Sequence, residues 1–143
     1  MTSLPRVIFD TSTLVSAAIR ARSVPGQALT RAFDLCSVCA TIPILEELFE
    51  VIARDKFSRY LDLEARRDFL STFVRRVQLF AVDPGEQRLI EPPCRDPKDR
   101  KFLELALICD AGVLVSSDCD RLVLNPWRGV SILQPAEFLT LRN

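Results

Sequence analysis

Four short runs of apolar residues constrain the fold of this chain more than any other feature of its sequence. The runs are continuous rather than alternating, which is typical of strands buried on both faces of a parallel sheet. They cover residues 7–9, 38–41, 113–116 and 130–133, with a weaker fifth candidate at 77–82. Helical stretches separate them at residues 13–20, 27–35, 43–54, 63–76, 98–110 and 136–141. Strands that alternate with helices predict right-handed crossovers and an α/β fold, a three-layer α/β/α sandwich with a mostly parallel central sheet.

The size and composition of the chain predict a single domain over residues 1–143. Hydrophobic residues make up 48 % of the chain, which is enough to form a core, and no repeat or linker interrupts it. No apolar stretch approaches the ~20 residues that a membrane-spanning helix requires. The N-terminal residues lack the basic and then apolar arrangement of a signal peptide. We therefore expect a cytoplasmic protein without a membrane association.

Charge and cysteine content exclude several classes of function. The 19 basic and 19 acidic residues balance, so the net charge does not indicate nonspecific coating of nucleic acid. The five cysteines are an odd number, which argues against a complete disulfide framework. Cys36 and Cys39 form a C-x-x-C pair, but the chain has no histidine and no second such pair to complete a zinc site. We interpret these two cysteines as small packing residues.

Acidic residues occur where the predicted strands end and where two predicted helices begin. Asp10 follows the first apolar run and Asp118 follows the run at 113–115, while Glu47 and Asp99 lie in the first turns of helices. A parallel sheet brings such positions to one edge, where ligands of open α/β sheets bind. A cluster of carboxylates without histidine is typical of Mg²⁺ or Mn²⁺ sites that act on phosphates. The four acids are therefore candidates for one metal site.

Each acid also has a purely structural interpretation. Asp10 or Ser12 could cap the helix that follows, and Asp118 and Asp120 could belong to an ordinary polar turn. Glu47 could simply complement the helix dipole. Its place beside the apolar stripe favours it only slightly over Glu46 as a site residue.

The helix start at residues 96–99 has the same ambiguity. Asp96 suits the N-cap, Pro97 the first helical position and Asp99 the third. Asp99 also lies on the same face as the apolar residues of its helix, where an unpaired carboxylate is costly. Capping and metal binding are therefore equally good interpretations of Asp99, whereas Asp96 fits a cap better.

Several segments together resemble the PIN domain, the nuclease fold of VapC-type toxins, and the likeness runs nearly end to end. The matching segments are residues 7–17, 45–52, 94–103, 114–120 and 132–139. The resemblance implies that Asp10, Glu47, Asp99 and Asp118 are the catalytic acids and the ligands of Mg²⁺ or Mn²⁺. It also implies an auxiliary role for Asp120 and for the Ser116 hydroxyl, where the family usually has threonine. Ser12 replaces the usual asparagine, a change that removes an amide from the surroundings of Asp10.

The resemblance implies a metal-dependent endoribonuclease that is the toxin of a toxin–antitoxin pair. A bound cation would activate a water for attack on phosphorus. The resemblance also implies that a cognate antitoxin covers the acidic groove and that the protein forms a homodimer. Basic residues that could contact the RNA lie in two short segments, and each segment could equally be a solvated surface. They are Arg54, Lys56 and Arg59, and then Lys98, Arg100 and Lys101.

Two alternatives to the toxin remain open at this point. One is a nuclease of the same type that processes RNA or cleaves DNA flaps. The other is a catalytically silent module that binds nucleic acid or protein, a possibility raised by Ser12. A phosphatase with an aspartyl nucleophile fits less well, because position 12 would then carry a second aspartate.

Overall fold

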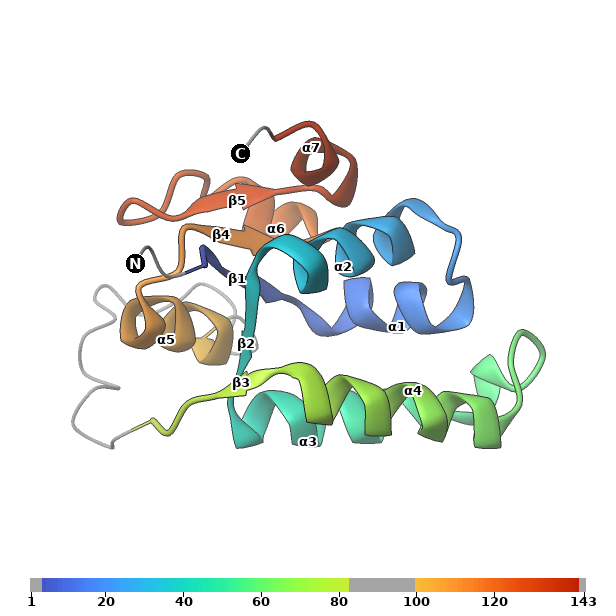
Figure 1. The fold of residues 1–143 in the computed structure, drawn as a ribbon. Coiled ribbons are helices and arrows are strands. Elements are labelled where there is room, and N and C mark those ends of the chain that lie inside the picture. Colours follow the sequence, from blue (N-terminus) through green and yellow to red (C-terminus); the bar gives the residue numbers. More distant parts are fainter. Residues whose placement is uncertain (1–3, 83–99, 142–143) are drawn as a thin grey trace.

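A five-stranded sheet forms the centre of the molecule in a computed structural model that describes residues 4–82 and 100–141 (Figure 1). The strand order is β3-β2-β1-β4-β5, and every pair of neighbours is parallel. The strands are β1 (Arg6–Phe9), β2 (Ser37–Ala40), β3 (Gln78–Leu79), β4 (Val113–Val115) and β5 (Ser131–Leu133). The five predicted strands are thus confirmed, and the weakest prediction corresponds to the two-residue β3.

Helices cover both faces of this sheet. Within the described residues they are α1 (Thr11–Ile19), α2 (Val24–Leu35), α3 (Ile42–Ile52), α4 (Leu63–Arg76), α5 (Arg100–Cys109), α6 (Cys119–Leu122) and α7 (Pro135–Leu139). Strand β2 lies on one side of β1 and β4 on the other, so right-handed crossovers place the first helices and α5 on opposite faces. Figure 1 shows α5 across the sheet from α1 and α2. The expected three-layer α/β/α fold is confirmed.

The core lies between the central strands and these helices. Val7, Ile8 and Phe9 of β1 are almost completely buried, and the Phe9 ring packs edge-on against Phe138 of α7 with ring centroids 6.0 Å apart. Burial on both faces explains why the strand sequences are continuously apolar. In the described part of the chain, none of the helices has the length and apolarity that crossing a membrane requires.

Two short helical elements were not predicted from the sequence. One is the 3₁₀ helix Asp55–Phe57 and the other is α6, which spans four residues. Elements this short do not complete a periodic apolar pattern, so the sequence around them resembles a polar turn. The predicted helix at 98–110 corresponds to α5, which runs from Arg100 to Cys109. Its expected start at Lys98 lies outside the described residues.

The strand order determines where a site can form. The chain leaves β1 toward β2 on one side and returns later to β4 on the other side, so β1 and β4 flank the switch point of the topology. In open α/β sheets the crevice at the carboxyl ends of such strands is the usual ligand site. Asp10 follows β1 and Ser116 follows β4 at this edge of the sheet.

Arg66 of α4 is a buried cation, 1 % exposed, that holds the end of α3 in place. Its Nη1 donates to the carbonyl oxygens of Ile52 at 2.7 Å and Arg54 at 3.2 Å. Its Nε donates to the Leu61 carbonyl at 3.0 Å. The carbonyls at a helix end carry partial negative charge and lack hydrogen-bond partners within the helix. A guanidinium supplies both a positive charge and the missing donors.

Replacing Arg66 with methionine should destabilise the protein. We expect the free energy of unfolding to fall by about 2–4 kcal/mol, because hydrogen bonds to a charged group are lost and carbonyls are left without partners. Urea denaturation followed by circular dichroism measures the change. The exposed neighbour Arg67, changed to methionine, is the matched control. Equal effects of the two substitutions would show that the buried hydrogen bonds contribute nothing.

Candidate active site

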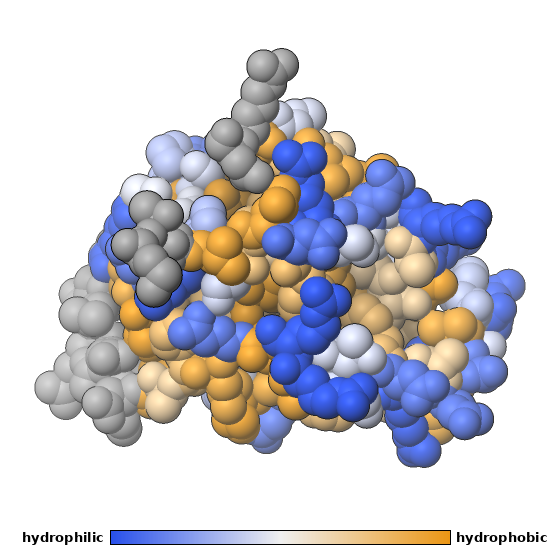
Figure 2. Space-filling view, in the orientation of Figure 1, coloured by the Kyte–Doolittle hydropathy of each residue, from blue (hydrophilic) through white to orange (hydrophobic). Residues whose placement is uncertain are grey.

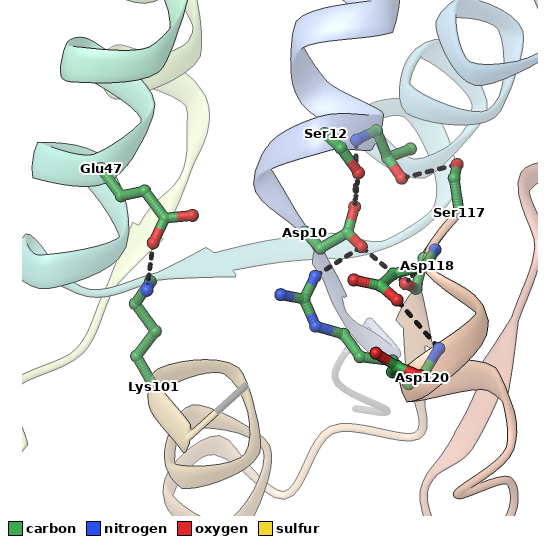
Figure 3. Close-up of polar contacts among 10 residues, drawn as sticks. Asp10, Ser12, Glu47, Lys101, Ser117, Asp118 and Asp120 are labelled. Carbon is green, nitrogen blue, oxygen red and sulfur yellow. Dashed lines mark hydrogen bonds and ion pairs between the residues drawn. The ribbon is translucent and has the colours of Figure 1, made fainter. Parts of the chain in front are cut away.

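Asp10 is the central residue of the candidate site, and its side chain is fully buried. It follows β1 directly and caps α1, because its Oδ1 accepts a hydrogen bond from the backbone N–H of Thr13 at 3.0 Å. The Ser12 hydroxyl donates to the same oxygen at 3.4 Å (Figure 3). Capping therefore explains one oxygen of Asp10, while the other oxygen faces the opposite direction, toward β4 and α6.

Ser116 links Asp10 to Asp118. It lies at the end of β4, is fully buried, and donates its hydroxyl hydrogen to Asp10 Oδ2 at 2.6 Å. The same hydroxyl oxygen accepts a hydrogen bond from the backbone N–H of Asp118 at 3.0 Å. Asp118 in turn caps α6 by accepting from the backbone N–H of Asp120 at 2.8 Å. Asp10, Ser116 and Asp118 thus lie together at the switch point, with the exposed Asp120 beside them (Figure 3).

Arg121 of α6 supplies a positive charge inside this group. Its Nη1 donates to Asp10 Oδ2 at 2.7 Å, and the side chains of the pair are 8 % and 0 % exposed. The guanidinium carbon lies over the ring of Phe102, 4.7 Å from its centroid, in a cation–π contact. The buried charge of Asp10 is therefore compensated by a residue of the chain itself.

Glu47 forms a second ion pair with a residue of the chain. It projects from α3 and pairs with the Lys101 ammonium of α5, and Figure 3 shows the two apart from the Asp10 group. Partial burial alone would raise the pKa of Glu47, but Lys101, Thr11 and Arg121 outweigh it, so the pKa is lowered. Thr11 Oγ1 is buried without a partner at hydrogen-bond distance in the described residues, yet it lies close enough to Glu47 to contribute to this shift. Glu46, the residue before Glu47, is exposed, whereas Glu47 is half-buried, in line with the slight preference for Glu47 as the site residue.

The predicted basic residues fall into two places. Arg100 and Lys101 both lie in the first turn of α5, where Arg100 pairs with Glu104 at 2.8 Å and Lys101 pairs with Glu47. Arg54 pairs with Glu50, and Lys56 stacks on Phe57 in the loop after α3. That loop lies at the far end of α3 from the sheet (Figure 1), where many hydrophilic residues gather (right side of Figure 2). The structure therefore does not bring Arg54 and Lys56 to the acids.

Three predicted residues are not placed here. Asp96, Lys98 and Asp99 lie outside the described residues. The roles of Asp99 as the fourth carboxylate and of its two neighbours therefore stay predictions.

The oxygen donors suit a hard divalent cation. Mg²⁺ and Mn²⁺ prefer carboxylate oxygens, and the Ser116 hydroxyl bonds both the Asp10 carboxylate and the backbone N–H of Asp118, the residue that carries the second carboxylate. Residues 4–82 and 100–141 do not by themselves bring three carboxylate or thiol side chains into a group that could hold a metal ion. The Arg121 guanidinium also donates a hydrogen bond to Asp10 Oδ2, the oxygen that accepts from Ser116. The donor chemistry thus fits a metal, while the charges of Arg121 and Lys101 oppose one.

Sequence reasoning did not identify Arg121, nor the Thr13 and Ser117 hydroxyls, which lie 3.1 Å apart beside Asp10. The available signal was the spacing of Arg121, three residues after Asp118, which puts both on one face if the segment is helical. Because α6 has only four residues, no apolar pattern showed that it is a helix.

The fold and the acids define an open α/β protein with a candidate ligand site at its switch point, and comparison with known families identifies the family. A sequence model described as the PIN domain matches residues 6–120. The chain therefore belongs to the PIN domain family. Membership in this family supports a nuclease, which is a hydrolase of phosphodiester bonds.

One known protein is similar to this chain in sequence, and a solved structure is similar in fold. An uncharacterised protein of Methanocaldococcus jannaschii, MJ1680, is 29 % identical over 120 residues, which are 83 % of this chain and 74 % of that protein. The structure of PAE2754 from Pyrobaculum aerophilum superposes with a TM-score of 0.64 at 14 % identity and covers 96 % of both chains.

Two solved VapC structures have the same fold. VapBC2 from Rickettsia felis, bound to a promoter DNA fragment, gives a TM-score of 0.63 at 14 % identity over 89 % of this chain and 96 % of that one. VapC20 of Mycobacterium tuberculosis is a toxin that cleaves the sarcin–ricin loop. Its structure gives a TM-score of 0.59 at 13 % identity and covers 87 % of this chain and 98 % of that one. The fold is therefore that of VapC proteins.

The Asp10–Arg121 pair should stabilise the metal-free protein as a unit. We expect Asp10→Asn and Arg121→Gln each to lower the free energy of unfolding by about 3–5 kcal/mol, since each leaves one buried charge unpaired. The double variant should lose less than the sum of the two, by about 1–3 kcal/mol. Urea denaturation of the four proteins in EDTA measures this coupling. Strictly additive losses would mean that the two charges do not interact.

Proposed function

We propose that this protein is a metal-dependent endoribonuclease and the toxin of a toxin–antitoxin pair. The observation that carries the proposal is the Asp10–Ser116–Asp118 group at the switch point of a PIN domain. A buried aspartate whose second oxygen is directed away from the helix it caps has a role beyond capping. Paired carboxylates at this edge of an α/β sheet suit a site for a cation and a phosphodiester.

The residues have distinct roles in this proposal. Asp10 and Asp118, with Glu47 and Asp99, would hold Mg²⁺ or Mn²⁺. The cation, when bound, would polarise the phosphodiester and lower the pKa of a bound water. Ser116 orients the Asp10 carboxylate and holds the Asp118 backbone through its single hydroxyl, and the exposed Asp120 would add negative charge beside the site. Lys101, which pairs with Glu47, and its neighbour Arg100 carry side chains that suit the phosphates of an RNA strand.

An antitoxin and a homodimer complete the proposed system. Among the proteins of similar fold, VapC20 is a toxin that cleaves the sarcin–ricin loop, and VapBC2 is bound to a DNA fragment from their promoter. In this chain a hollow between α3 and α4 is lined by Phe49, Leu63 and Leu70, and the first two of these side chains are exposed. Exposed apolar side chains around a hollow suit an apolar face of a partner protein.

One specific observation favours a second function, a catalytically silent module that binds nucleic acid or protein. Arg121 already neutralises Asp10, and Lys101 already neutralises Glu47. If these pairs persist in every state, the acids stabilise the fold rather than hold a metal. Ser12, in place of the usual asparagine, fits the same interpretation.

Cleavage of RNA by the purified protein tests the proposal. We expect single-stranded and structured RNA to be cut with Mn²⁺ or Mg²⁺, leaving 5′-phosphate and 3′-hydroxyl ends, and to stay intact in EDTA. Asp118→Asn should lower the rate by at least about 100-fold, or roughly 3 kcal/mol, because a metal ligand is lost. Asparagine still caps a helix well, so α6 should remain folded in this variant.

Asp68→Asn is the matched control, because Asp68 is an exposed aspartate on α4. It should cut RNA at the wild-type rate. Cleavage of DNA flaps in preference to RNA would replace the toxin with a processing nuclease. No cleavage with any metal, by folded protein free of a bound partner, would favour the silent module.

A further inference from the structure

Arg121 differs from the other ion-paired arginines of the described chain in its burial and its surroundings. The exposed Arg54–Glu50 pair has side chains that are 47 % and 68 % exposed, whereas those of Arg121 and Asp10 are 8 % and 0 % exposed. Ion pairs of the first kind contribute little, because water screens them. In the buried pair, neither charge can be left alone without a large cost in free energy.

Arg121 and the neighbouring acids are carried by one short element. Asp118 caps α6, Asp120 lies in its first turn, and the Arg121 backbone N–H donates to the Asp118 carbonyl at 3.1 Å. The Phe102 ring of α5 supports the guanidinium from the other side, and this ring is fully buried. The fold therefore holds Arg121 at the acids rather than leaving it to reach them from the surface.

The oxygens of Asp10 have little capacity for a further partner. Oδ1 accepts from the Thr13 backbone and the Ser12 hydroxyl, while Oδ2 accepts from the Ser116 hydroxyl and the Arg121 guanidinium. A carboxylate oxygen offers about two lone pairs, so a cation can coordinate Oδ2, which accepts at 2.6 and 2.7 Å, only when one of these two donors leaves. The Arg121 charge also repels a second cation at the same oxygen. Of the two donors to Oδ2, Arg121 carries the positive charge, so it is the donor that a cation at this oxygen would displace.

We propose that Arg121 is an internal counter-ion that competes with the divalent cation for Asp10. In the metal-free protein it neutralises the buried carboxylate, and in the metal-bound protein it releases Asp10 while remaining on α6 beside the site. The competition lowers the affinity of the protein for metal in exchange for a stable metal-free fold. This inference rests on the proposed metal site and assigns to that site a residue that opposes metal binding.

Direct binding of Mn²⁺ tests the competition. We would strip the protein with EDTA and titrate Mn²⁺ by calorimetry and by electron paramagnetic resonance of the free ion. Arg121→Gln should bind Mn²⁺ at least about tenfold more tightly than wild type, which corresponds to about 1.4 kcal/mol. Its melting temperature should be lower than that of wild type in EDTA and should rise more when Mn²⁺ is added. Arg67→Gln, at the exposed position on α4, is the matched control and should bind as wild type does.

A second measurement uses the wild-type protein, in case Arg121→Gln does not fold. The Nε–Hε nuclear magnetic resonance signal of Arg121, assigned by its loss in Arg121→Lys, should move on saturation with Mg²⁺. Its exchange with water should accelerate as the ion pair with Asp10 opens. An arginine with only a structural role would keep both its position and its slow exchange.

The outcomes separate the inference from the proposed function. If wild type binds Mn²⁺ and Arg121→Gln binds it equally or more weakly, the competition is wrong and the metal nuclease stands. An Arg121 signal unchanged in Mg²⁺-saturated protein contradicts the competition in the same way. If neither wild type nor Arg121→Gln binds Mn²⁺ at millimolar concentrations, the proposed metal-dependent function fails together with the inference.

Discussion

The carboxylate of Asp10 is the constraint on which the arrangement of this site depends. A buried negative charge requires hydrogen-bond donors, and those of Asp10 come from three parts of the fold. The Thr13 backbone belongs to α1, Ser116 follows β4, and Arg121 belongs to α6. One side chain therefore ties the end of β1 to the helix that follows it and to the strand and helix across the switch point. Packing of the apolar strands fixes the sheet, and the hydrogen bonds of Asp10 fix the arrangement of residues at its carboxyl edge.

The parallel topology accounts for why acids far apart in the sequence meet. Asp10 and Asp118 are separated by more than half of the chain, yet β1 and β4 are direct neighbours in the sheet, with Phe9 opposite Val115. Parallel strands end at the same edge, so the residue after each strand faces the same crevice. Glu47 reaches this region from α3, a helix on the side of β2. Membership in the PIN domain family and the likeness to VapC folds agree with this arrangement.

The sequence was sufficient to predict the fold, because each buried strand is a continuous apolar run and each helix longer than two turns has a periodic face. It also identified Asp10 and Asp118 as neighbours of strand ends, which follows from the topology alone. It did not predict the pairing of Asp10 with Arg121 or of Glu47 with Lys101. Those contacts depend on side-chain directions from a four-residue helix and from the first turn of α5, which no period in the sequence encodes. The expected fourth acid, Asp99, lies outside the described residues.

The two internal ion pairs follow from a general difficulty of carboxylate sites. Acids gathered for a cation repel each other before the cation arrives, and burial increases that cost. A chain can reduce the cost by exposing the acids to water or by supplying a positive charge of its own. Glu47 and Lys101 combine both solutions, since their side chains are 26 % and 21 % exposed. Asp10 is fully buried and depends on Arg121, so the residue that compensates its charge in the metal-free protein is also the one that a cation at Asp10 Oδ2 would have to displace.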